Sequence, residues 1–104
     1  MRRGEFERVY REGARRAGAH FVVFGRPGAA SAARSRFGIS VKKALGGAVV
    51  RNRTKRRIRE ILRRNQSEIP TGWDIVIHPR GQVARASFAI MEAELLSLLR
   101  RLAR

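Results

Sequence analysis

Residues 49–65, VVRNRTKRRIREILRRN, contain eight arginine or lysine side chains and one glutamate. A helix through this segment turns about 100° per residue, so Arg51, Lys55 and Arg59 fall in one row at i, i+4 spacing. Like charges at that spacing destabilise a helix unless a partner neutralises them. Arginine suits planar, bidentate contacts to phosphate and stacking on bases. We therefore interpret the segment as a polyanion-binding helix, the alternative being an ordinary solvated helix face.

The same helix carries an apolar stripe about 120° wide that would face a core. Its members are Val50, Thr54, Ile58, Ile61 and Leu62. Asn52 lies on the basic flank and can both donate and accept hydrogen bonds, which would fix an orientation that charge alone cannot. Gly46 and Gly47 precede the helix, so unpaired backbone N–H groups at its start would add an anion site.

The carboxylates are too scattered to indicate hydrolysis by the polypeptide, which usually needs clustered carboxylates that hold metal ions. Glu92 and Glu94 are two residues apart and would point to different helix faces. His20 and His78 lack the spacing of metal ligands, and we interpret His78 as a strand-end residue. The chain has no cysteine, which excludes disulfides and thiolate sites. We expect no catalytic residue, no metal site and no cofactor bound by the protein alone.

Hydrophobic periodicity predicts the elements that position these residues. A short helix should run from Glu5 to about Ala14, with Phe6 and Tyr10 on its apolar face. Strands are predicted at 20–25, 36–42 and 73–78, with a loop at 27–35. A final amphipathic helix should run from about Ala86 to Leu102. The order α-β-β-α-β-α predicts a single domain over residues 1–104, an α-β sandwich with helices on a small mixed sheet.

Composition indicates the partner. The 104 residues include 24 Lys and Arg but only 8 Asp and Glu, a formal net charge of +16. This favours nucleic acid, with an anionic membrane surface as the alternative. No apolar run approaches the roughly 20 residues of a membrane span, and the N-terminus lacks a signal-like apolar region. We expect a cytoplasmic protein. Phe24, with Phe6 and Tyr10, could stack the bases of single-stranded RNA, unless these rings are simply core.

The segment RNRTKRRIRE (51–60) resembles the signature of the protein subunit of bacterial ribonuclease P. The likeness extends over about residues 5–102 and includes EFERVYREG, HFVVF, FGISVKK, GGAVV and WDIVIHPRG. An RNR triplet alone is a weak signal. RNRxKR placed after G-x-S-V-x-K and before D-I-V-I is a specific one.

The resemblance implies a small basic subunit that joins a catalytic RNA and assists removal of the 5′ leader from precursor tRNA. The chemistry and its Mg²⁺ would belong to the RNA, with no membrane and no small-molecule substrate involved. The residues implied to face the catalytic RNA are Arg51, Asn52, Arg53, Lys55, Arg56, Arg59 and Lys43. Those implied to line a cleft for the leader are Phe6, Tyr10, Val22 and Phe24. The family's β-α-β crossover is left-handed, against the general rule.

Two departures from the family pattern affect these assignments. In SVKKALGG either the lysine pair is shifted by one residue or Ala44 replaces its second lysine, so we prefer Lys43 to Lys42. Phe24 stands where many members have tyrosine, which removes a hydroxyl contact.

Two other classes of protein remain as alternatives, a general structured-RNA binder such as a ribosomal protein, and a DNA-binding or membrane-surface protein. The joint occurrence of the RNR helix and the aromatic cleft residues argues against the first. The absence of Trp and Phe from the helix stripe, and of a dimerisation segment, argues against the second.

Overall fold

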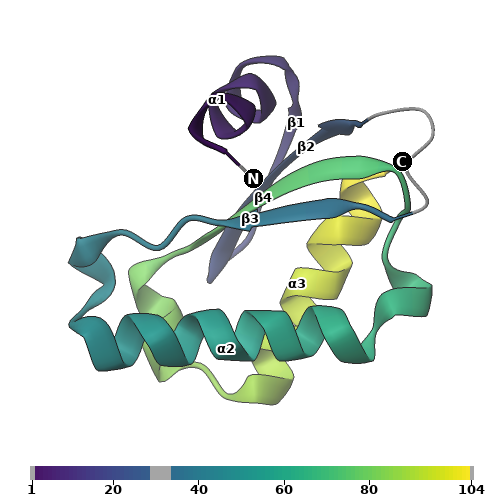
Figure 1. Cartoon of the computed structure of the whole chain (residues 1–104). Helices are drawn as coiled ribbons and strands as arrows, with labels where there is room; N and C mark the ends of the chain where they lie inside the picture. Colours follow the sequence, from purple (N-terminus) through teal and green to yellow (C-terminus); the bar gives the residue numbers. More distant parts are fainter. Residues whose placement is uncertain (1, 29–33, 104) are drawn as a thin grey trace.

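The computed structural model describes residues 2–28 and 34–103. A four-stranded sheet forms the middle layer, with one helix on one face and two helices on the other (Figure 1). Residues 29–33 of the predicted 27–35 loop lie outside the described residues. No helix in the described ranges is both long enough and apolar enough to cross a membrane.

The helices and strands follow the predicted order, with one extra strand. They are α1 (Arg3–Glu12), β1 (Ala14–Ala17), β2 (Phe21–Pro27), β3 (Arg36–Ile39), α2 (Ala48–Arg64), β4 (Trp73–Pro79) and α3 (Phe88–Leu102). Short 3-10 turns occur at Lys43–Leu45, Gln66–Glu68 and Gly81–Arg85. The prediction of a small domain with helices on a sheet is confirmed.

The sheet order is β1-β2-β4-β3. Strand β2 runs antiparallel to both β1 and β4, whereas β3 and β4 are parallel neighbours joined through α2. The sheet is therefore mixed, as predicted. The left-handedness of the β3-α2-β4 crossover stays a prediction.

The predicted ends of the first helix and of the second predicted strand were wrong, and one strand was missed. The first helix ends at Glu12 rather than near Ala14, because the chain turns at Gly13 and forms β1, which was missed. The sequence Ala-Arg-Arg-Ala contains no β-branched or aromatic residue, so it gives no local strand signal. It is extended because it pairs with the edge of β2. Strand β3 ends at Ile39 rather than at residue 42.

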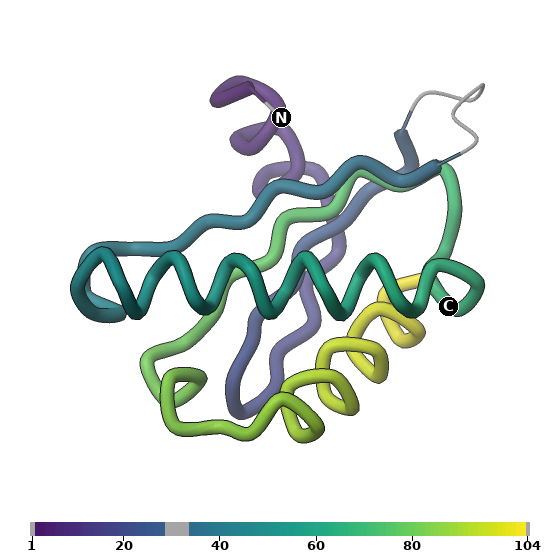
Figure 2. Tube along the Cα trace, turned by 60° about the horizontal axis from the view of Figure 1, so that its bottom comes forward, coloured from purple at the N-terminus to yellow at the C-terminus, as the bar shows by residue number. Residues whose placement is uncertain are grey.

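The main core lies between the sheet and the pair α2 and α3, which cover the same face (Figure 2). Alternate residues of β2 and β4 point into it, among them Phe21, Val23, Ile75 and Ile77. The helical side chains buried there include Ile58, Ile61, Met91, Leu95, Leu98, Leu99 and Leu102. The α2 stripe is confirmed at its centre, where Thr54, Ile58 and Ile61 are buried. Val50 and Leu62 are half-buried at its edges.

The opposite face of the sheet is only partly covered, by α1. Val9 of α1 is buried, as are Val22 of β2 and Val76 of β4 on that face. Two ion pairs hold α1 to the sheet. Arg36 of β3 contacts both Glu5 of α1 and Asp74 of β4, and Arg26 lies 3.0 Å from Glu12. The part of this face beyond α1 remains accessible.

Candidate nucleic-acid interface

The basic side chains of α2 lie outside the core, as its periodicity predicts. Asn52, Lys55, Arg56 and Arg59 line one shallow hollow of about 410 Å³ together with the largely exposed Val49. Four of the predicted RNA-facing residues are thereby brought together on one surface, which we call the α2 ridge.

The other predicted RNA-facing residues lie outside the α2 ridge. Arg53 lies beside Arg57 and Phe88, on another part of the helix surface. Arg51 is half-buried, and its Nε has no hydrogen-bond partner among the described residues. Lys43 is exposed in the turn before α2 and does not line the ridge hollow.

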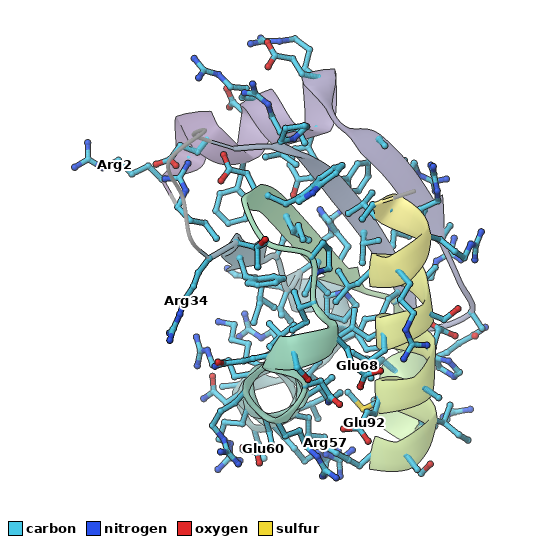
Figure 3. The ribbon with its side chains drawn as sticks, turned by 90° about the vertical axis from the view of Figure 1, so that its right-hand side faces the viewer. Arg2, Arg34, Arg57, Glu60, Glu68 and Glu92 are labelled. Carbon is cyan, nitrogen blue, oxygen red and sulfur yellow. The ribbon has the colours of Figure 1, made fainter. Side chains whose placement is uncertain are left out.

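All eight carboxylates of the chain are engaged by basic side chains. The arginine pairs are Glu5 and Asp74 with Arg36, Glu7 with Arg3, Glu12 with Arg26, Glu60 with Arg63, Glu68 with Arg100, and Glu92 with Arg64. Glu94 contacts Nδ1 of His20 at 3.1 Å. Figure 3 shows Glu92 and Glu68 between α2 and α3, and Glu60 on the side of α2 turned away from the sheet. Six of the eight carboxylates join different elements of the fold, whereas Glu7 and Glu60 pair within their own helices.

This pairing leaves the centre of α2 without internal neutralisation. Within residues 2–28 and 34–103, no carboxylate pairs with any basic side chain from Arg51 to Arg59, whereas Arg63 and Arg64 in the last turn are both paired. The unpaired positive charges from Arg51 to Arg59 repel one another, and this repulsion favours binding of an external polyanion. In the same part of the chain, no group of three or more His, Asp or Glu side chains could hold a metal ion.

A second surface lies on the α1 face of the sheet, where three rings form a cluster. Tyr10 of α1 meets Phe24 of β2 edge to face, with ring centroids 5.0 Å apart. His78 of β4 lies 5.1 Å from Tyr10 and 5.5 Å from Phe24, centroid to centroid. The Tyr10 hydroxyl is hydrogen-bonded to Nε2 of His78. The cluster joins α1 and β2 to the distant strand β4, since Tyr10 and His78 are 68 positions apart in the sequence.

Next to the cluster is a hollow of about 300 Å³. The residues that line this hollow include Arg15, Val22, Phe24, Lys42 and His78. Its lining thus combines apolar and aromatic groups with basic side chains. We call the ring cluster and this hollow the aromatic cleft.

The structure brings Tyr10, Val22 and Phe24 together as predicted. Phe6 lies one turn before Tyr10 on α1 and is half-buried, outside the ring cluster. His78, interpreted from the sequence as a strand-end residue, lies near the end of β4 and is also a member of the cleft, which the sequence did not indicate. Lys42, which was ranked below Lys43, also lines it. Alternation along β4 could have placed His78 on the Val76 face, but only the register shows it opposite Val22.

Burial has electrostatic consequences in the cleft. Desolvation, and to a lesser extent the charge of Lys42, lowers the pKa of His78 below its usual 6.5. Burial raises the pKa of Tyr10. Nε2 of neutral His78 can accept a hydrogen bond from the Tyr10 hydroxyl or donate one to it, depending on the imidazole tautomer. The lowered pKa of His78 favours this neutral form.

We expect stability to fall as the pH is lowered from 7.5 to 5. The pKa of His78 is lower in the folded than in the unfolded chain, so the unfolded chain binds more protons in this window. Urea unfolding across the pH range should show a shallower dependence for His78→Phe than for the wild type. His20→Asn serves as the control and should keep the part of the pH dependence due to His78. An identical profile for His78→Phe would contradict this assignment.

A mixed sheet with an unneutralised arginine helix on one side and an aromatic cleft on the other defines a small RNA-binding α/β protein. The sequence model of the family described as Ribonuclease P matches residues 1–103, and the chain belongs to this family. The resemblance found in the sequence is confirmed.

Curated relatives and solved structures agree with this assignment. The ribonuclease P protein component of Desulfovibrio desulfuricans is 44% identical, over 99% of this chain and 81% of the relative. The RNase P protein from Thermotoga maritima superposes with a TM-score of 0.89 at 40% identity, covering 97% of this chain and 94% of that one. The Staphylococcus aureus RNase P protein superposes with a TM-score of 0.85 at 32% identity, covering 96% of this chain and 90% of that one. The chain thus has a role in tRNA 5′ leader processing as part of a ribonucleoprotein holoenzyme.

Proposed function

We propose that the α2 ridge binds the catalytic RNA of ribonuclease P and that the aromatic cleft holds the single-stranded 5′ leader of precursor tRNA. The observation that carries the first assignment is the distribution of ion pairs. Every carboxylate is engaged, yet the basic residues from Arg51 to Arg59 have no carboxylate partner in the described part of the chain. The phosphates of an RNA backbone are negatively charged and arranged in a row. They can therefore neutralise the row of positive side chains on the helix.

The chemistry of the aromatic cleft supports the second assignment. Unpaired bases stack on aromatic side chains, and basic groups beside them bind the phosphates. Phe24 and Tyr10 supply rings, while Arg15 and Lys42 supply positive charge at the edge. A duplex buries its bases and could not use these rings, so the cleft favours a single strand.

In this proposal the polypeptide positions the 5′ leader and neutralises negative charge on the RNA, and the catalytic RNA carries out the cleavage. The protein would lower the repulsion between the catalytic RNA and the precursor tRNA. Mg²⁺ would be held by the RNA, with no cofactor on the protein. This work would take place in the cytoplasm.

Reconstitution tests the proposal. The purified chain is added to a bacterial ribonuclease P RNA at low Mg²⁺, and removal of the 5′ leader is followed. Cleavage that depends on both components is the expected result. Tight RNA binding without stimulated cleavage would leave only a general structured-RNA binder.

Replacing Phe24 by Ala should weaken holoenzyme binding to precursor tRNA while leaving binding to mature tRNA nearly unchanged. The expected loss is about 1–3 kcal/mol, because only the precursor has a leader base to stack on the ring. Phe88→Ala is the control, since Phe88 lies on α3 beside Arg53 and away from the cleft, so any loss it causes should be the same for both tRNAs. Equal losses for both tRNAs would show that Phe24 acts only in packing, once circular dichroism has confirmed folding.

A further inference from the structure

A pocket of about 480 Å³ lies between the start of β3, the last turns of α2 and the segment that follows α2. Its lining combines apolar side chains, among them Phe37, Leu62 and Ile69, with a few polar ones and three arginines. The arginines are Arg34, Arg59 and Arg63. Figure 3, which views α2 end-on, shows Arg34 extending from the sheet into solvent. The pocket is separate from the aromatic cleft, which is on the other face of the sheet.

We propose that this pocket receives one unpaired nucleobase of the RNA bound along α2, with an adjacent phosphate on Arg59 and Arg34. The proposal rests on the assignment of the α2 ridge to RNA. It adds a second, base-binding subsite to a surface otherwise described by charge alone.

Continuity with the α2 ridge is the first reason. Arg59 lines both the ridge hollow and the pocket. A strand whose phosphates follow Asn52, Arg56 and Arg59 therefore arrives at the pocket mouth without leaving the helix. Arg63 is held by Glu60, whereas neither Arg34 nor Arg59 makes an ion pair with any described residue. The rim thus keeps two guanidinium groups for an incoming phosphate.

The combination of apolar walls and a basic rim is the second reason. A phosphate alone would need no apolar walls, and an apolar ligand would need no cations. A nucleotide presents a flat, weakly polar base and a charged phosphate, and so matches both parts. The volume lies within the range of about 300–1,000 Å³ typical of ligand pockets.

The pocket is preformed, because packing and hydrogen bonds within the protein hold its lining residues in place. Phe37 and Leu62 pack against the main core and so are held in place. The Ser35 hydroxyl donates to the carbonyl of Pro70 and accepts from the backbone N–H of Trp73, which ties the opposite wall to β4. Such preorganisation lowers the ordering cost of binding. The exposed Gln66, which also lines the pocket, carries an amide that can donate hydrogen bonds to a base edge and accept them from it.

The first test separates stacking from charge. Phe37→Leu keeps an apolar side chain but removes the ring, and Ile39→Leu is its matched control on the same core-facing side of β3. Affinity for a bacterial ribonuclease P RNA should fall about tenfold for Phe37→Leu, within the range for a lost base stack. The slope of log affinity against log salt should not change, because no phosphate contact is lost. Affinity equal to that of Ile39→Leu would overturn the proposal.

The second test uses the absence of native cysteine. Thr71→Cys at the exposed pocket rim and Ser97→Cys on the exposed face of α3 each carry one thiol for the same bulky, uncharged maleimide. Labelling should weaken RNA binding about tenfold at position 71 and leave it unchanged at position 97. Unchanged binding at both positions would refute the pocket assignment while the wild-type chain still supports cleavage. Failure of the wild type itself to bind or to support cleavage would instead refute the proposed function.

Discussion

The double substitution Arg56→Ala and Arg59→Ala should weaken binding to the catalytic RNA by about a hundredfold at moderate salt. Both side chains line the α2 ridge and have no carboxylate partner among the described residues. A charge-assisted hydrogen bond contributes about 1.5 kcal/mol, so two lost contacts account for that factor. The slope of log affinity against log salt should become shallower by about two units, one for each phosphate contact. Filter binding over a salt series measures both quantities.

A control with the same change in net charge distinguishes local contact from overall attraction. Arg100→Ala and Arg101→Ala remove two exposed arginines from the last turn of α3. Among the described residues, only the surface ion pair between Arg100 and Glu68 is lost. Such a pair contributes at most about 1 kcal/mol to stability. The salt slope should stay near that of the wild type. Equal slopes for the two double variants would mean that the α2 ridge is ordinary solvated charge.

Gly13→Ala should destabilise the fold by about 1–3 kcal/mol and impair recognition of the leader. The backbone at Gly13 is ordinary, with φ near −87°, so the requirement is one of space. An added Cβ would lie 2.5 Å from the carbonyl oxygen of Val9 and 2.7 Å from that of Gly25. Both are backbone atoms, so α1 would have to move away from β2. Because α1 carries Tyr10, the aromatic cleft would open.

Two measurements test this expectation. Urea unfolding should show the loss of stability, and the preference of the holoenzyme for precursor over mature tRNA should fall. Gly4→Ala is the matched control on the same helix, because nothing lies within 4 Å of its added Cβ. It should be neutral or slightly stabilising, since alanine is the better helix former. A Gly13→Ala protein with wild-type stability and preference would show that α1 tolerates displacement.

The sequence alone determined the character of α2. The angles between residues of a helix are fixed locally by its 3.6-residue period. The spacing of Thr54, Ile58 and Ile61 therefore predicted a buried stripe, which was confirmed. The basic row predicted from Arg51, Lys55 and Arg59 was only partly found, because Arg51 is half-buried and the surface hollow groups Lys55 and Arg59 with Asn52 and Arg56. The motif around these residues identified the family, because several short segments matched in the correct order along nearly the whole chain.

Only the tertiary structure decided which distant groups meet. Arg36 joins Glu5 to Asp74 across three elements, and His78 meets Tyr10 across 68 positions of sequence. Such contacts depend on strand register and on where each helix packs, which no local period encodes. For the same reason β1 was missed, since its strand conformation comes from pairing with β2 rather than from its own residues. The sequence specified a basic helix and a set of rings, and packing decided which charges stayed unpaired and which rings formed a cleft.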